Sequence, residues 1–196
     1  MNLAFSPWAE FHRLELIGFI VPAFPAGAGV ECLYTGVPTP ALITGVMMGP
    51  VDMEVRVLDV APQPPASEWE DVVELPVELE QNATIAGATQ IPGLDTPWLG
   101  VDAGDYTMRV SSRGADVNYD LAVDRASQSI AVELWRATSR LPHVHRCRSR
   151  RGSERRAPNP ALRSGARVGG VTQDRSTEED NLAQIARRRS LARAVQ

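Results

Sequence analysis

The stretch VDAGDYTMRVSSRGADVNYDLAVDRASQSIAVELWR, residues 101–136, decides the fold class of this chain. After a turn at residues 102–105, Tyr106, Met108 and Val110 alternate with polar residues. This period of two predicts a half-buried strand. The same alternation returns over residues 117–124 and 130–135, each time after a polar break. Three short strands with short connections pair most simply as an antiparallel meander.

Similar strand patterns precede this stretch. Residues 11–21 are rich in Phe, Leu and Ile and stop at Pro22, and residues 51–57 and 73–79 alternate apolar with mostly charged side chains. Because Pro76 cannot donate to a ladder, its strand is expected at a sheet edge. We count about eight strands and no convincing helix before residue 138. The predicted fold class is all-β, an antiparallel β-sandwich of about eight strands, with a barrel as the alternative.

Charge divides the chain in two. Residues 1–138 hold 19 acidic residues and 6 arginines, a net charge of −13, whereas residues 139–196 hold 14 arginines and 5 acidic residues, a net of +9. The second part has too few apolar residues to offset the entropy of ordering. We therefore predict an acidic β-sandwich domain at 1–138, a disordered basic linker at 139–175 and a short C-terminal helix at 176–196. A tail translated in a different reading frame is an alternative, which translation of the other frames would test.

Composition and spacing restrict the chemistry. All 20 basic residues are arginine, so the lysines of Schiff-base enzymes, P-loops and kinases are excluded. Cys32 and Cys147 lie in no CxxC spacing and predict no disulfide framework. His12 is the only histidine before residue 138 and is expected to be structural. His143 and His145 stand beside an arginine run, which repels cations. We predict no catalytic residue, no metal and no cofactor, and hence a protein that is not an enzyme.

The apolar run at residues 16–30 is the one candidate for targeting. Pro22 and Pro25 interrupt it, and acidic residues stand where a signal peptide has positive charge. It is also shorter than the roughly 20 residues of a membrane helix. We expect a cytoplasmic protein that does not contact a membrane.

With strands and turns placed, residues 104–116 (GDYTMRVSSRGAD) and 132–137 (VELWRA) resemble uncharacterised actinobacterial β-sandwich proteins, which share a G-x-Y-R-x-R-V-x-x-R-G-R-D strand and an L-x-W-P-A strand. Thr107, Ala115 and Arg136 depart from that pattern. More distantly, the strand order resembles the competence protein J family, whose characterised member inhibits a nuclease. The resemblance covers about half of the chain and implies the fold, but it transfers no site residue.

The acidic domain points to a basic partner. Outward carboxylates along the predicted strands would create a negative field that steers a basic protein and can imitate a phosphate backbone. The first hypothesis is a non-enzymatic protein-binding domain, an inhibitor or immunity-like protein. The candidate partner-binding residues are Asp52, Glu54, Glu74, Glu78, Glu80, Arg113 and Asp116.

Two alternatives stay open. Aspartates in the turns suit a carbohydrate- or calcium-binding module, or a weak hydrolase, because hard cations take clustered oxygens. The Arg-rich tail suits contact with the phosphates of a nucleic acid, although it lacks interleaved aromatic residues. The sequence leaves the oligomeric state open.

Overall fold

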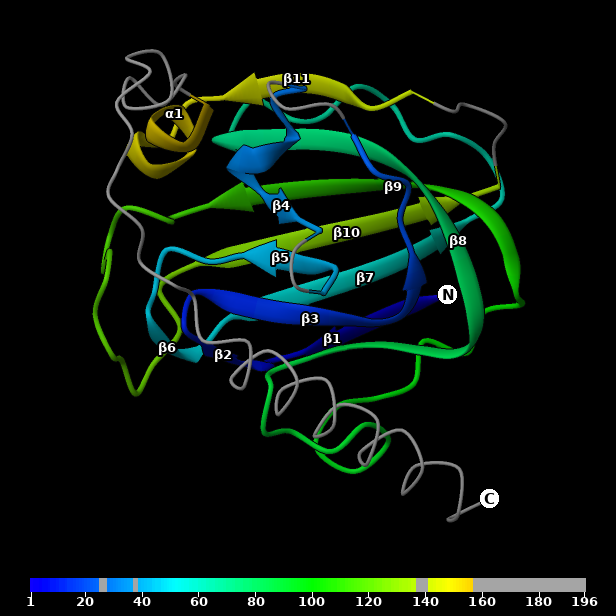
Figure 1. Cartoon of the computed structure of the whole chain (residues 1–196), viewed down its shortest axis with the longest axis horizontal. Helices are drawn as coiled ribbons and strands as arrows, with labels where there is room; N and C mark the ends of the chain where they lie inside the picture. Colours follow the sequence, from blue (N-terminus) through cyan, green and yellow to red (C-terminus); the bar gives the residue numbers. More distant parts are fainter. Residues whose placement is uncertain (25–27, 37–38, 137–140, 157–196) are drawn as a thin grey trace, which may run out of the picture. The chain divides into compact units, whose positions relative to one another are not determined.

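The computed structural model describes residues 1–24, 28–36, 39–136 and 141–156. Within these ranges the chain forms eleven strands, one short 3-10 helix and one short α-helix (Figure 1). In chain order these elements are β1 (Asn2–Phe5), β2 (Trp8–Glu10), β3 (Arg13–Ile20), η1 (Val30–Cys32), β4 (Tyr34–Thr35), β5 (Ala41–Ile43), β6 (Met48–Pro50), β7 (Asp52–Leu58), β8 (Asp71–Ala86), β9 (Gly104–Arg113), β10 (Ser129–Trp135), β11 (His143–Cys147) and α1 (Arg150–Arg156). The predicted all-β class is confirmed. No helix in the described ranges is long and apolar enough to cross a membrane.

The strands form one curled, mixed sheet in the order β1-β7-β10-β9-β8-β3-β2-β6, with β11 beside β8 and β5 beside β3. The long strand β8 makes the curl, because its first half pairs with β9 and its second half pairs with β3. Figure 1 shows β3, β4 and β5 in front of β7, β9 and β10. One sheet therefore supplies both layers of a sandwich-like fold. Strand β10 pairs with β7 in parallel, unlike the purely antiparallel sheet that was predicted, because β8 and β9 form the crossover that parallel pairing needs.

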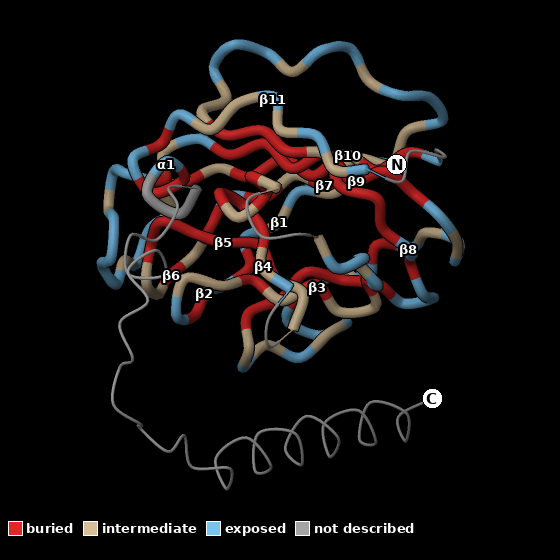
Figure 2. The backbone as a smooth tube through the Cα atoms, turned by 45° about the horizontal axis from the view of Figure 1, so that its top comes forward, coloured by how far each residue is buried: buried red, intermediate tan, exposed pale blue. Residues whose placement is uncertain are grey.

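Alternate side chains fill the space between the two layers. Met108 of β9 lies fully buried with Leu14 of β3, Leu75 of β8 and Val132 of β10, and Figure 2 shows the buried strands as the red centre of the molecule. Burying each of these side chains contributes about 1.5–3 kcal/mol. The predicted alternation of β9 is thus the alternation between the core and the outer face of the sheet.

The prediction that Pro76 marks an edge strand is wrong. Strand β8 is internal, with β9 along one side. On its other side the pairing with β11 ends at Glu74 and the pairing with β3 begins at Glu78. Pro76 lies in the gap between these two partners, so the strand tolerates a residue that lacks an N–H group.

The strand predicted at residues 117–124, the middle of the meander, does not form. Residues 117–120 form turns, Ala122 makes an isolated bridge to Met48, and β9 pairs directly with β10. The segment bonds instead to residues 45–48: Asp120 N donates to Gly45 O at 3.0 Å, and Met47 N donates to Leu121 O at 2.9 Å. Three of its alternating apolar side chains, Val117, Tyr119 and Leu121, are exposed, and Val123 packs against the edge of the core.

The structure also differs from the disorder predicted after residue 138, because β11 and α1 lie within that range. Strand β11 pairs with the first half of β8. The buried Asp71 holds the junction to α1 by accepting hydrogen bonds from Arg148 N (2.7 Å) and Ser149 N (3.0 Å). The rest of the predicted linker and the helix predicted at 176–196 lie outside the described residues, so the domain division stays a prediction.

Candidate functional site

A strained turn stands at one end of the sheet. Strands β2 and β3 pair at Glu10 and Arg13, which leaves Phe11 and His12 as a two-residue turn. Both residues have positive φ, 50° and 63°. Turns of this kind normally use Asn-Gly, because a side chain in the left-handed region costs roughly 1–2 kcal/mol per residue. The chain holds Phe11 in this conformation although its side chain is 73% exposed.

The backbone and imidazole of His12 lock the turn. His12 N donates to Met47 O at 3.1 Å, and His12 O accepts from Thr44 N at 2.9 Å. The Arg151 guanidinium, which can only donate, lies 2.6 Å from His12 Nδ1. The same nitrogen lies 3.1 Å from Gly45 O and 3.3 Å from Thr44 O, and Nε2 lies 2.9 Å from Asp120 Oδ1. With both ring nitrogens engaged, His12 positions the turn, in agreement with the structural role expected for it.

The connection between β9 and β10 packs on this turn. The Tyr119 ring stacks on the His12 imidazole with centroids 6.1 Å apart. On the same ring, the Arg151 guanidinium lies 5.4 Å from the centroid, in the range of a cation–π contact. Asp120 itself has a positive φ of 61°. Three side chains from the β2–β3 turn, α1 and the connection thus fix one another.

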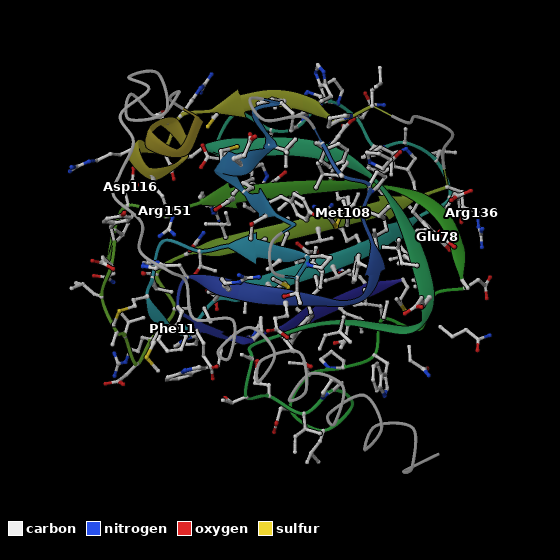
Figure 3. The ribbon with its side chains drawn as sticks, in the orientation of Figure 1. Phe11, Glu78, Met108, Asp116, Arg136 and Arg151 are labelled. Carbon is white, nitrogen blue, oxygen red and sulfur yellow. The ribbon has the colours of Figure 1, made fainter. Side chains whose placement is uncertain are left out.

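Four apolar side chains in this region face solvent. We call them the Phe11 end: Phe11 (73% exposed), Val117 (67%), Tyr119 (43%) and Leu121 (54%). Asp116, Asp120 and Asp124 are exposed within the same connection. Figure 3 shows Phe11, Asp116 and Arg151 on the side of the molecule away from Glu78. Exposed apolar groups bordered by polar ones are typical of interaction surfaces.

The outer face of the sheet carries a second group of charges, the charged ladder: Arg56, Glu133, Arg109, Glu74 and His145. The first four are direct cross-strand neighbours from β7 to β8. Arg109 is buried, with Nη2 at 2.7 Å from Glu74 Oε1 and Nη1 at 3.4 Å from Glu133 Oε2. Arg109 Nη1 also donates to Gln63 O at 2.7 Å, which ties the loop of residues 59–70 over this face.

Glu74 is neutralised within the charged ladder. Burial raises the pKa of its carboxyl, but hydrogen bonds from Arg109 and His145, together with their positive charge, outweigh burial and lower the pKa below its ordinary value. His145 Nε2 lies 2.8 Å from Glu74 Oε1. Glu74 is therefore a poor candidate for contact with a basic partner, contrary to its inclusion in the predicted surface.

The register places the predicted residues Asp52, Glu54, Glu74 and Glu78 on the outer face of the sheet, spread from β7 to β8. Asp52 and Glu54 lie on β7, where Ser6 Oγ donates to Asp52 at 3.3 Å and Arg56 pairs with Glu54 at 3.5 Å. Glu78 and Glu80 lie exposed on β8.

Arg113 and Asp116 are two further predicted partner-binding residues. Arg113 lies beside the outer loop, and Asp116 lies at the Phe11 end. Arg113 covers the Trp69 ring at 5.2 Å. Asp116 accepts from Arg150 N at 2.7 Å and Arg151 N at 3.3 Å, which places it at the Phe11 end. Of the seven predicted residues, Asp116 alone belongs to the site that the structure assembles.

The described residues contain no group of three or more His, Cys, Asp or Glu side chains that could hold a metal ion. Of the turn aspartates considered for calcium, Asp116 accepts from Arg150 N at the start of α1, and Asp120 contacts His12. The His143 ring lies edge-on to the ring of His145, with centroids 4.4 Å apart, and His145 Nε2 lies 2.8 Å from Glu74 Oε1.

Comparison with known proteins gives distant matches of fold. No family model matches the chain, and no curated protein matches it. ComJ from Bacillus subtilis, an inhibitor of the DNA degrading activity of NucA, is similar with a TM-score of 0.43 and 10% identity over 70% of this chain and 96% of that chain. A protein named Crocagin biosynthetic gene J is similar with a TM-score of 0.42 and 14% identity over 70% of this chain and 98% of that chain. Neither match identifies a site residue here.

Proposed function

We propose that this chain is a non-enzymatic protein-binding domain, an inhibitor or immunity-like protein, that binds a basic protein through the Phe11 end. One observation carries the proposal: an exposed phenylalanine is held at the tip of a turn whose two residues both have positive φ. Strained backbone persists only where its surroundings enforce it, and it gathers at functional sites. Here the enforcing contacts are those of His12.

Rigidity makes Phe11 a suitable anchor. Binding energy at protein interfaces concentrates in a few aromatic residues that fill pockets of the partner. The backbone that carries Phe11 is already fixed, so less conformational entropy is lost when Phe11 binds. The ring of Tyr119 is itself held between His12 and Arg151. Together they offer a preorganised apolar surface of the kind a partner pocket accepts.

Charge sets the expected class of partner. Asp120 and Asp124 border the apolar side chains, and residues 1–156, which include β11 and α1, hold 20 acidic residues and 13 arginines, a net charge of −7. This field steers positively charged proteins and repels acidic ones. The resemblance to the competence protein J family suggests a nuclease as the first partner to test.

The test uses basic DNA-degrading nucleases as probes. We expect the full chain to slow DNA cleavage by at least one of them in proportion to complex formed. Phe11→Ala should weaken this inhibition by at least about 30-fold, which corresponds to the loss of one anchor residue. Val60→Ala is the matched control, because Val60 is as exposed (74%) but lies in the loop on the outer face.

Two outcomes would contradict the proposal: no nuclease bound or slowed by the full chain, or equal inhibition by Phe11→Ala and wild type. Calcium titration by calorimetry tests the alternative of a calcium-binding module, which requires a heat signal that Asp116→Asn abolishes.

A further inference from the structure

Cys32 and Cys147 are far apart in the sequence and meet in the fold. Cys32 ends η1 and is 2% exposed, while Cys147 ends β11 and is half-buried against the same core. A hydrogen bond joins the two thiols. Both cysteines are free, although no disulfide framework could be expected from their spacing.

Backbone holds the pair in place from the α1 side. A Cβ atom built on Gly152 would lie 2.9 Å from Cys147 Sγ and 3.0 Å from Asp71 Oδ2. The first turn of α1 therefore closes tightly over the thiol. Asp71 fixes the preceding residues through its bonds to Arg148 N and Ser149 N. The two sulfurs are thus brought together by fixed elements rather than by mobile loops.

The two thiols are chemically unequal. The hydrogen bond to Cys147, burial and the nearby charge of Asp71 all raise the pKa of Cys32 far above its ordinary value. The two thiols also differ in exposure: Cys32 is 2% exposed, whereas Cys147 is half-buried and is the one that can meet a reagent from solvent.

We propose that Cys32 and Cys147 form a reversible disulfide by exchange with a small-molecule disulfide such as oxidised glutathione. The Cys147 thiolate attacks one glutathione sulfur, forming a mixed disulfide and releasing one glutathione thiolate. Cys32 then loses its proton to solvent and attacks Cys147 Sγ, which releases the second glutathione. The two protein thiols are oxidised, and one glutathione disulfide is reduced to two thiols.

The bond would fasten the β11–α1 segment to η1. This segment supplies Arg151, whose guanidinium contacts both His12 and Tyr119. Closing so long a loop restricts the unfolded chain and stabilises the fold. Oxidation would therefore stiffen the support of the Phe11 end, whereas the exchange chemistry itself does not depend on any partner.

Peptide mapping of the full chain after incubation with oxidised glutathione tests the bond directly. Because all basic residues are arginine, trypsin leaves Cys147 in the dipeptide Cys147–Arg148 and Cys32 in the peptide 14–56. We expect one product that joins these two peptides, the loss of both free thiols, and recovery of both with dithiothreitol. The thermal midpoint should rise by roughly 5 °C or more on oxidation.

Single variants distinguish this route from adventitious oxidation. Cys32→Ser should stop at the mixed disulfide, with one glutathione retained on Cys147, and Cys147→Ser should leave Cys32 unreacted in the folded protein. Dimers linked through Cys147, stable glutathione adducts on the wild type, or thiols that stay reduced while a surface dithiol control peptide oxidises would overturn the proposal.

Discussion

Glu78 on β8 stands directly opposite Asp105 on β9, and both carboxylates are exposed. No ion pair within the described part of the chain reaches either of them. Like charges at directly opposed positions destabilise a sheet by roughly 0.2–1 kcal/mol. The pair lies on the side of the molecule away from the Phe11 end (Figure 3).

Relieving this repulsion should stabilise the protein. We expect Glu78→Gln to raise the free energy of unfolding by about 0.5 kcal/mol in low salt, and the gain to shrink in high salt because salt screens exposed charges. Urea denaturation at two salt concentrations measures it. A loss of stability in Glu78→Gln would show that the carboxylate has a stabilising partner.

Arg109 should be the most important charge for stability. Its removal leaves Glu74 and Glu133 facing each other on a covered face, and we expect Arg109→Ala to cost about 3 kcal/mol. Arg109→Lys should lose less stability than Arg109→Ala, because lysine keeps the positive charge. It should still be less stable than wild type, because one ammonium group cannot reach Glu74, Glu133 and Gln63 O together. Urea denaturation compares the two. Equal losses would mean that packing rather than charge explains the effect.

Stability should depend on pH through Glu74. Its folded pKa is lowered, so its stabilisation is present above the ordinary pKa of a glutamate and disappears as the pH falls through the folded pKa. The advantage of wild type over Glu74→Gln in unfolding free energy should therefore shrink between about pH 5 and about pH 3. An advantage that stays constant over this range would contradict the lowered pKa.

Phe11→Gly should separate stability from binding. Glycine relieves the positive φ of Phe11 but gains freedom in the unfolded chain, so we expect a net stabilisation of roughly 0.5–1 kcal/mol. Nuclease inhibition should be lost. Asn82→Gly is the control, because Asn82 also has a positive φ of 64° but lies on β8. Asn tolerates this conformation, so its replacement should change stability little and leave inhibition intact. Loss of inhibition in both variants would argue against a specific role for Phe11.

A test of nucleic-acid binding by the Arg-rich tail has to remove the tail and leave β11 and α1 in place. Arg146 donates to Pro65 O, Ala66 O and Trp69 O, and Arg151 lies within the Phe11 end, so both serve the ordered body. A cut at residue 138 would remove β11 and α1 together with the tail. We expect any retention on DNA to vanish when the chain is cut after residue 158, and retention by the shortened chain would move the contact onto the folded body.

The strands with strict alternation could be predicted from sequence, and the connections between them could not. Residues 51–57 and 106–111 alternate because one face packs into the core, and both are strands. The alternation at 117–124 is equally clean, yet Val117, Tyr119 and Leu121 are exposed and the segment is not a strand. Period alone does not reveal whether an opposing layer exists. Strand β11 was missed because it draws its stability from pairing with β8, which composition does not show.

Most residues of the candidate site could not be predicted from the sequence. Asp116 was predicted on charge, but Phe11, Tyr119 and Arg151 come from three distant segments. The one local signal was Phe-His at a strand junction where Asn-Gly would be usual, and it is visible only once the register of β2 and β3 is known. The pairing of Glu74 with Arg109 was also beyond the sequence, because it follows from the register of β8 and β9.

Hydrogen exchange of the full chain, measured with and without a saturating amount of the nuclease that it slows, tests the binding surface most directly. The account predicts slowed exchange at residues 8–13 and 115–123, with little change along β9. Slowed exchange confined to residues 78–80 and 104–106, with the Phe11 end unchanged, would place the partner on the acidic pair and contradict it.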